Sequence, residues 1–222
     1  GFTGAALRAV GSPTGQVYTP RGAPTDRNQD WVDAWAEGKW VFLGACEPEP
    51  VVNLGWFNAP ASRGMLMSAR VFGRYTGPEE IIDTTPNITE VNVTHNYAPV
   101  AKATVKAIDT DGNPVTDALV EFKVYNYADF YTIESKKTDE NGEASLTTGK
   151  GDLLVWVSKD GLFGLGKLQV AKEGYVEVTL EWGLGNIDKS LLPLDIDVTP
   201  PAENVLLPDV SEGQRTQNNK RM

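Results

Sequence analysis

Residues 101–125 read AKATVKAIDTDGNPVTDALVEFKVY, with apolar and polar side chains alternating on both sides of a turn. Successive side chains of a strand point to opposite faces, so this alternation predicts strands at Ala101–Ile108 and Ala118–Tyr125. Between them, Asp109 to Pro114 contains Asp, Gly, Asn and Pro, the residues that favour tight turns. The pattern predicts antiparallel β-structure with one face buried in a core.

The same alternation continues on both sides of this pair of strands. Short strands at this spacing, separated by turn signals such as Glu140-Asn141-Gly142, are typical of a β-sandwich. We therefore predict an antiparallel β-sandwich over residues 88–182. The further strands expected are Thr89–Thr94, Tyr131–Ser135, Glu143–Thr147, Leu153–Ser158, Phe163–Gln169 and Tyr175–Glu181.

The residues before the sandwich predict a separate domain over residues 1–85. Its composition gives way after Gly77 to a segment rich in Pro, Thr and Asn, which indicates a boundary near residue 85. Residues 183–222 lose periodicity and predict a linker or tail. The fold class expected is α+β, mostly β. The elements expected in the first domain are a helix at Phe2–Val10, strands at Gln16–Thr19 and Ser68–Tyr75, and a hairpin of Gln29–Trp35 and Lys39–Leu43.

Composition excludes several classes of protein. The 222 residues include 30 acidic and 20 basic side chains, and the net charge of −10 argues against a nucleic-acid partner. No apolar run is long enough to span a membrane. One cysteine and one histidine cannot build an internal disulfide or a multi-histidine metal site, and no cofactor is expected. Asp109 to Asn113 resembles a calcium loop, but Val120 stands where its bidentate Glu belongs.

Two runs carry a family resemblance: Asn28-Gln29-Asp30-Trp31-Val32-Asp33 and Gly44-Ala45-Cys46-Glu47-Pro48-Glu49-Pro50. Residues 1–75 resemble the transglutaminase-like (papain-fold) domain of secreted proteins of gut Bacteroidetes. The module that follows resembles Ig-like or prealbumin-like modules of bacterial surface proteins. The resemblance implies a partial papain-like domain followed by a β-sandwich. It also implies an extracellular, periplasmic or cell-surface location.

The family that the chain resembles transfers or cleaves amides with a Cys-His-acid triad. In this chain Gln29 stands in the position of the histidine, Glu47 matches the acid, and the cysteine would lie before Gly1. A neutral amide cannot accept a proton near pH 7, so Gln29 cannot replace the histidine as a base. The resemblance therefore implies a catalytically inactive fragment of a transglutaminase-like protein.

The alternative is a cell-surface module that binds a peptide or a glycan, or that acts as a spacer. The aromatic residues Trp31, Tyr125, Tyr127 and Phe130 are the candidate ligand-binding side chains, and core packing is the competing explanation for them. If the chain is truncated, the apolar helix at Phe2–Val10 loses a packing partner. An exposed apolar face of this kind predicts association, for example as a homodimer.

Overall fold

The computed structural model describes residues 2–19, 30–44, 52–55, 58–126, 129–183 and 197–202, together with 212, 213 and 216. The described residues up to Pro99 belong to one compact unit and those from Val100 to Ala202 to a second. The strand expected at Thr89–Thr94 is found at Ile88–Asn92 and belongs to the sheet of the first unit.

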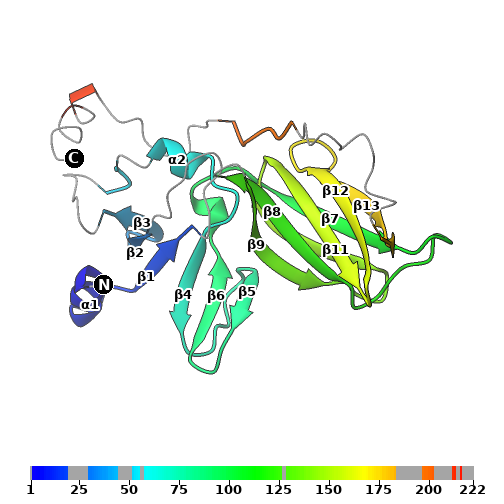
Figure 1. Ribbon diagram of the computed structural model, residues 1–222. Helices are drawn as coiled ribbons and strands as arrows, with labels where there is room; N and C mark the ends of the chain where they lie inside the picture. Colours follow the sequence, from blue (N-terminus) through cyan, green and yellow to red (C-terminus); the bar gives the residue numbers. More distant parts are fainter. Residues whose placement is uncertain are drawn as a thin grey trace. The chain divides into compact units, whose positions relative to one another are not determined.

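The first unit is built on an antiparallel sheet with the strand order β3-β2-β1-β4-β6-β5 (Figure 1). The expected hairpin is confirmed: β2 and β3 pair up to Ala36 and Lys39, and Glu37 and Gly38 form the turn with positive φ angles of 50° and 79°. The elements are α1 (Phe2–Ala9), β1 (Thr14–Tyr18), β2 (Asp30–Ala36), β3 (Lys39–Leu43), α2 (Asn58–Ser62), β4 (Ser68–Phe72), β5 (Ile81–Thr84), β6 (Ile88–Asn92) and the 3-10 turn η1 (Thr94–Asn96).

One face of this sheet holds the core of the first unit. Val17 on β1 lies directly opposite Trp31 on β2 and Ala69 on β4, so the three side chains share that face. Trp31 packs edge-on against Phe42 and Tyr97, with ring centroids 6.5 Å and 5.1 Å apart. This packing fixes the position of Tyr97, which follows η1, against the middle of β2.

The partial papain-like α+β domain expected for residues 1–85 is not what the structure shows. The described residues of the first unit form an antiparallel sheet with two short helices, α1 and α2. The physical reason is that the Trp31–Trp35 and Lys39–Leu43 runs are short, rich in aromatic and β-branched side chains, and joined by a turn, which favours strands over helix. Gln29 and Glu47, the expected remnants of a triad, lie outside the described residues.

The second unit contains two sheets, as expected for a β-sandwich. One has the order β10-β7-β13 and the other β14-β12-β11-β8-β9 (Figure 1). All pairs are antiparallel except β7 with β13, the first strand of the unit and one of its last. The strands are β7 (Val100–Ile108), β8 (Leu119–Asn126), β9 (Asp129–Lys137), β10 (Glu143–Gly149), β11 (Asp152–Lys159), β12 (Leu162–Gln169), β13 (Tyr175–Thr179) and β14 (Glu181–Trp182).

Alternation along these strands places every second side chain in the core. Val105 on β7, Val120 and Phe122 on β8, and Val155 and Val157 on β11 are completely buried. The predicted turn after β7 is confirmed, because Asp109 Oδ1 accepts hydrogen bonds from the backbone N–H groups of Asp111 and Asn113. These bonds to the carboxylate lower the pKa of Asp109. Asp109 therefore acts as a turn residue.

Candidate functional site

A fork in the first sheet provides the candidate site. Strand β1 pairs with β2 from Thr14 to Tyr18, but with β4 only from Gln16 to Tyr18. Thr14 and Gly15, both in the described part of β1, therefore have no ladder partner on β4. The two strands diverge at this point, as Figure 1 shows. The backbone of Val71 and Phe72 at the end of β4 forms the other side of the fork.

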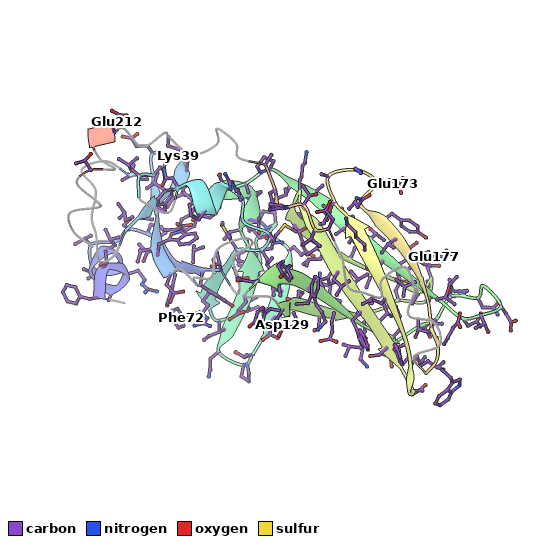
Figure 2. The ribbon with its side chains drawn as sticks, turned by 45° about the horizontal axis from the view of Figure 1, so that its top comes forward. Lys39, Phe72, Asp129, Glu173, Glu177 and Glu212 are labelled. Atoms are coloured by element: carbon purple, nitrogen blue, oxygen red, sulfur yellow. The ribbon has the colours of Figure 1, made fainter. Side chains whose placement is uncertain are left out.

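A pocket of about 410 Å³ lies at this fork. Its apolar wall comes from the core face of the sheet: Ala69 and Val71 on β4, Val91 on β6, and Val93 just after it. The aromatic side chains of Trp40, Phe72 and Tyr75 contribute the remainder of the apolar lining. Phe72, labelled in Figure 2, is 68% exposed and stands at the solvent side. Such an apolar pocket with a few convergent polar groups is the usual form of a ligand site.

Gly15 gives the pocket part of its volume. A Cβ placed on Gly15 would meet no other atom within 4 Å, so its position opens onto empty space. Gly15 pairs directly with Asp33 across the β1–β2 ladder. Side chains of directly opposed residues lie side by side, so the missing side chain leaves one flank of Asp33 open to the pocket.

Asp33 is the buried acid of the pocket, with 4% of its surface exposed. The Tyr97 hydroxyl lies 2.5 Å and 2.6 Å from the two carboxylate oxygens and donates its hydrogen bond to them. The indole N–H of Trp31 donates to the Tyr97 oxygen at 2.8 Å. The chain Trp31–Tyr97–Asp33 thus holds the carboxyl group from the core side, while Asp33 lines the pocket on the other.

Burial raises the pKa of the Asp33 carboxyl from 3.8 to about 7, and the hydrogen bonds from Tyr97 and Trp31 act in the opposite direction. The cause is the cost of placing a charge where water cannot solvate it. Burial, together with the neighbouring Asp33, also raises the pKa of Tyr97 well above its ordinary value. Asp33 therefore changes its charge near neutral pH, while Tyr97 keeps its proton.

Removing the Tyr97 hydroxyl should destabilise the charged form of Asp33. We expect Tyr97→Phe to lower the free energy of unfolding by about 1–3 kcal/mol at alkaline pH, the cost of losing a hydrogen-bond donor to a buried charge. The loss should be smaller in acid, where Asp33 is neutral. Denaturant unfolding at both pH values tests this, with Tyr175→Phe on the exposed side of β13 as the matched control. A loss of equal size for both variants would contradict it.

The pocket also contains a second carboxylate and two guanidinium groups. Glu79, before β5, lines the wall, and its Oε2 atom is buried without a hydrogen-bond partner among the described residues. Arg70 pairs with Glu90 at 3.0 Å and lies over the Tyr18 ring. Arg8 on α1 donates to the Gly4 carbonyl and lies over the Phe72 ring. The described residues that line the pocket include no cysteine, serine or histidine that could act as a nucleophile or a base–nucleophile pair.

The aromatic residues expected to bind a ligand are placed differently from one another. Trp31 is 2% exposed and belongs to the core, so its ring offers no face to solvent. Tyr125 and Phe130 are directly opposed on β8 and β9, with ring centroids 5.3 Å apart, and Tyr125 is 46% exposed. Tyr127 lies outside the described residues, as do Gln29 and Glu47. The structure therefore pairs two of the expected residues in the second unit, whereas Trp31 belongs to the core of the first.

Sequence reasoning missed Asp33, Gly15 and Glu79. One signal was present: Asp33 lies between Trp31 and Trp35 at period two, which places it on the aromatic face of the strand. An acid on a face that is otherwise apolar is a candidate buried charge. Gly15 and Glu79 carry no comparable signal, because their role depends on the fork between β1 and β4.

Two further findings concern metals and membranes. In the part of the chain that the structure describes, no cluster of three or more His, Cys, Asp or Glu side chains is arranged to hold a metal ion. Among the same residues, no helix has the length and apolar character that crossing a bilayer requires.

No family model matches this chain, and no curated protein matches it. Among solved structures, the chain is similar to catechol 1,2-dioxygenase from Acinetobacter sp. ADP1 inhibited by bound mercury, with 15% identity and a TM-score of 0.27 over 46% of this chain and 49% of that one. It is similar to 3-chlorocatechol 1,2-dioxygenase from Rhodococcus opacus 1CP, with 14% identity and a TM-score of 0.31 over 55% of this chain and 74% of that one. It is also similar to a streptococcal ancillary pilin, with 10% identity and a TM-score of 0.31 over 76% of this chain and 61% of that one.

The chain thus spans about half of the Acinetobacter enzyme, at 49%. At these TM-scores the likenesses say nothing about what this chain does. The described residues of the first unit form an antiparallel sheet with two short helices, where the resemblance implies a papain-like α+β domain. The resemblance to transglutaminase-like proteins of gut Bacteroidetes is therefore wrong.

Proposed function

We propose that this chain is a binding module without catalytic activity, and that its first unit binds an apolar segment of a peptide in the pocket at the β1–β4 fork. The observation that carries the proposal is the pocket itself, about 410 Å³ with an apolar wall and few polar groups. Its described lining includes no cysteine, serine or histidine, which supports binding over catalysis by a Cys-His or Ser-His pair.

The fork favours a peptide over other ligands. Thr14 and Gly15 on one side, and Val71 and Phe72 on the other, line the pocket beyond the last β1–β4 pair of the described residues. An extended peptide satisfies backbone groups of this kind by adding to the strand edge, and places alternate side chains in pockets. A glycan would use the apolar wall less well, because that wall offers few hydrogen-bonding groups.

Glycan binding at the second unit remains the alternative ligand hypothesis. It is favoured by Tyr125, which is 46% exposed at the end of the β8–β9 hairpin. The Phe130 ring packs against Tyr125 at 5.3 Å, however, so each ring serves as a cross-strand partner of the other. This pair accounts for both side chains without a ligand.

The spacer hypothesis has less support from the topology. Val100 at the start of β7 pairs with Gly149 at the end of β10. Thr199 and Asp152 exchange two hydrogen bonds, of 2.8 Å and 3.0 Å, at the start of β11. Gly149 and Asp152 flank the same short connection, so the chain enters and leaves the second unit at one end. An in-line spacer would need entry and exit at opposite ends.

Two expectations from the sequence stay predictions. One is an extracellular, periplasmic or cell-surface location. The other is association, for example as a homodimer, through the apolar face near α1. Phe2 at the start of α1 and Val10 just after its end are 90% and 80% exposed, which agrees with an uncovered apolar face.

Filling the pocket should abolish binding without unfolding the chain. Gly15→Leu places a side chain in open space at a φ angle that any residue adopts. The probe is N-acetyl-Leu-Val-norleucine-Val-Leu-amide, titrated into the full chain by calorimetry, and we expect the variant to weaken binding at least about tenfold by steric exclusion. Gln16→Leu is the matched control, since it adds the same side chain to the same strand but outside the pocket. Equal loss in both variants, or no binding by the unmodified chain, would overturn the proposal.

A further inference from the structure

Two carboxylates line the pocket without a cationic partner. Among the described residues, no basic side chain forms an ion pair with Asp33 or Glu79. Asp33 is 4% exposed and held by Tyr97 from the core side. Glu79 has a buried Oε2 atom without a partner among the described residues. The Tyr97 hydroxyl shares one proton between the two Asp33 oxygens, and Glu79 Oε2 has no donor in the described part of the chain. Both carboxylates line the pocket and can accept further hydrogen bonds.

The two arginines of the pocket are already engaged. Arg70 is paired with Glu90 at 3.0 Å and lies 4.7 Å from the Tyr18 ring centroid. Arg8 donates to the Gly4 carbonyl at 3.1 Å and lies 5.6 Å from the Phe72 ring centroid. Neither forms an ion pair with Asp33 or Glu79. The pocket therefore combines an apolar wall with two carboxylates that form no direct ion pair with a basic side chain of the described residues.

We infer that the ligand of this pocket carries an organic ammonium group on an apolar body, such as a lysine side chain flanked by apolar residues, with the ammonium bound at the Asp33 carboxylate. This inference rests on the proposed function and adds the charge of the ligand. The chemistry is complementary, because an ammonium offers three hydrogen-bond donors and its methylene stem packs along apolar surface. Glu79, on the same wall, adds a second acceptor.

A metal ion would fit this pocket less well. Hard cations require six or more oxygen ligands, whereas the wall is formed mainly by Ala69, Val71, Val91 and Val93. A lysine stem gains from burial against the same side chains. The apolar wall and the carboxylates therefore select a cation with a hydrocarbon body.

Three peptides that differ at one side chain test the inference on the full chain. They are N-acetyl-Leu-Val-X-Val-Leu-amide with lysine, norleucine or glutamate at X. Norleucine has the four-carbon stem of lysine without its ammonium group. At about pH 8, where Asp33 is ionised, we expect the lysine peptide to bind about tenfold more tightly than the norleucine peptide, as for a hydrogen-bonded charge pair. The glutamate peptide should bind more weakly than both.

Asp33→Asn should bring the lysine peptide to within about threefold of the norleucine peptide, whereas Asp30→Asn, an exposed change on the same strand, should leave the preference intact. At about pH 5 the unmodified chain should lose its preference for lysine, and Asp33→Asn should show no such change. The other titratable or charged groups facing Asp33 or lining the pocket are Tyr97, Arg8, Arg70, Tyr75 and Glu79, which both proteins share.

The outcomes separate the inference from the proposal on which it rests. If the norleucine peptide binds and the lysine peptide binds no better, the ammonium inference fails and the pocket function stands. If Asp33→Asn keeps the lysine preference, the ammonium inference fails at that residue. If no peptide binds, or if Gly15→Leu does not weaken binding, both fail together. A preference for lysine that disappears in Asp33→Asn alone supports both.

Discussion

Replacing Gly164 by alanine is expected to lower the free energy of unfolding of the second unit by about 1–3 kcal/mol, and Gly164→Val by more. Gly164 is a buried residue of β12 and lies against the end of β13. At that end the chain passes from the sheet that contains β13 to β14 in the other sheet. A Cβ at this position would come within 2.4 Å of the Thr179 carbonyl oxygen and 2.5 Å of a Val178 methyl. A backbone oxygen cannot rotate away, so the two sheets would have to separate locally.

The sign of this effect makes the test decisive. In an unobstructed strand, alanine is more stable than glycine by about 0.5–1 kcal/mol, because glycine loses more conformational freedom on folding. Gly15→Ala, in open space, should follow this rule. Gly166→Ala should be intermediate, because its new Cβ would first meet the Val178 and Val176 methyls, at 2.9 Å and 3.2 Å.

Hydrogen exchange of the amides of Val155 and Val157 on β11 reports the stability of the second unit within the full chain. An unchanged or slower exchange rate in Gly164→Ala would show that β12 and β13 tolerate a side chain between them. The close approach of the two strands would then not depend on glycine.

Local pattern predicted the strands well, because alternation acts within a few residues. The expected strand Leu153–Ser158 lies within β11 (Asp152–Lys159), and the expected helix Phe2–Val10 corresponds to α1 (Phe2–Ala9). The parallel pairing of β7 with β13 could not be predicted from local alternation. It joins Thr104 to Tyr175, residues far apart in sequence, and is set by how the two sheets close.

The composition change after Gly77 also had a different meaning from the one expected. The segment contains β5 and β6, which complete the sheet of the first unit, so its Thr and Asn residues belong to strands and turns. Thr85, for example, exchanges hydrogen bonds with Ile88 in the β5–β6 turn. The compact units meet in sequence at Pro99 and Val100.

The candidate site was less accessible to sequence reasoning than the fold. A pocket depends on where paired strands separate, and the pairing of β1 with β4 ends at Gln16. Before Gln16 come Gly15, which has no side chain to pack, and Pro13, which has no N–H to donate. The resemblance points to Gln29 and Glu47, whereas the structure places Asp33 at the pocket. Asp33 lies in the run Asn28 to Asp33 that carries the resemblance, where the family pattern assigns it no role in the chemistry.

Asp33 should make the chain less stable as pH rises through neutrality. Its pKa is raised from 3.8 to about 7 in the folded state, so the folded protein binds a proton more tightly than the unfolded chain does. For a raised carboxyl pKa, the stabilising contribution is complete below about pH 4 and disappears as pH passes about 7. This displacement of the pKa corresponds to about 4 kcal/mol between those limits.

Asp33→Asn isolates this contribution, because asparagine keeps the shape of the side chain and its acceptor for Tyr97 but stays neutral. We expect the stability of the variant relative to the unmodified chain to increase by about 4 kcal/mol between about pH 4 and about pH 8, so that the variant is the more stable protein in alkaline solution. Denaturant unfolding across this range, with Asp30→Asn as control, measures the difference while other carboxylates cancel. A flat difference would mean that Asp33 keeps an ordinary pKa, and that water or a counter-ion reaches it through the pocket. In the protein without ligand, the charge of Asp33, which the ammonium group is inferred to neutralise, would then not lower the free energy of unfolding.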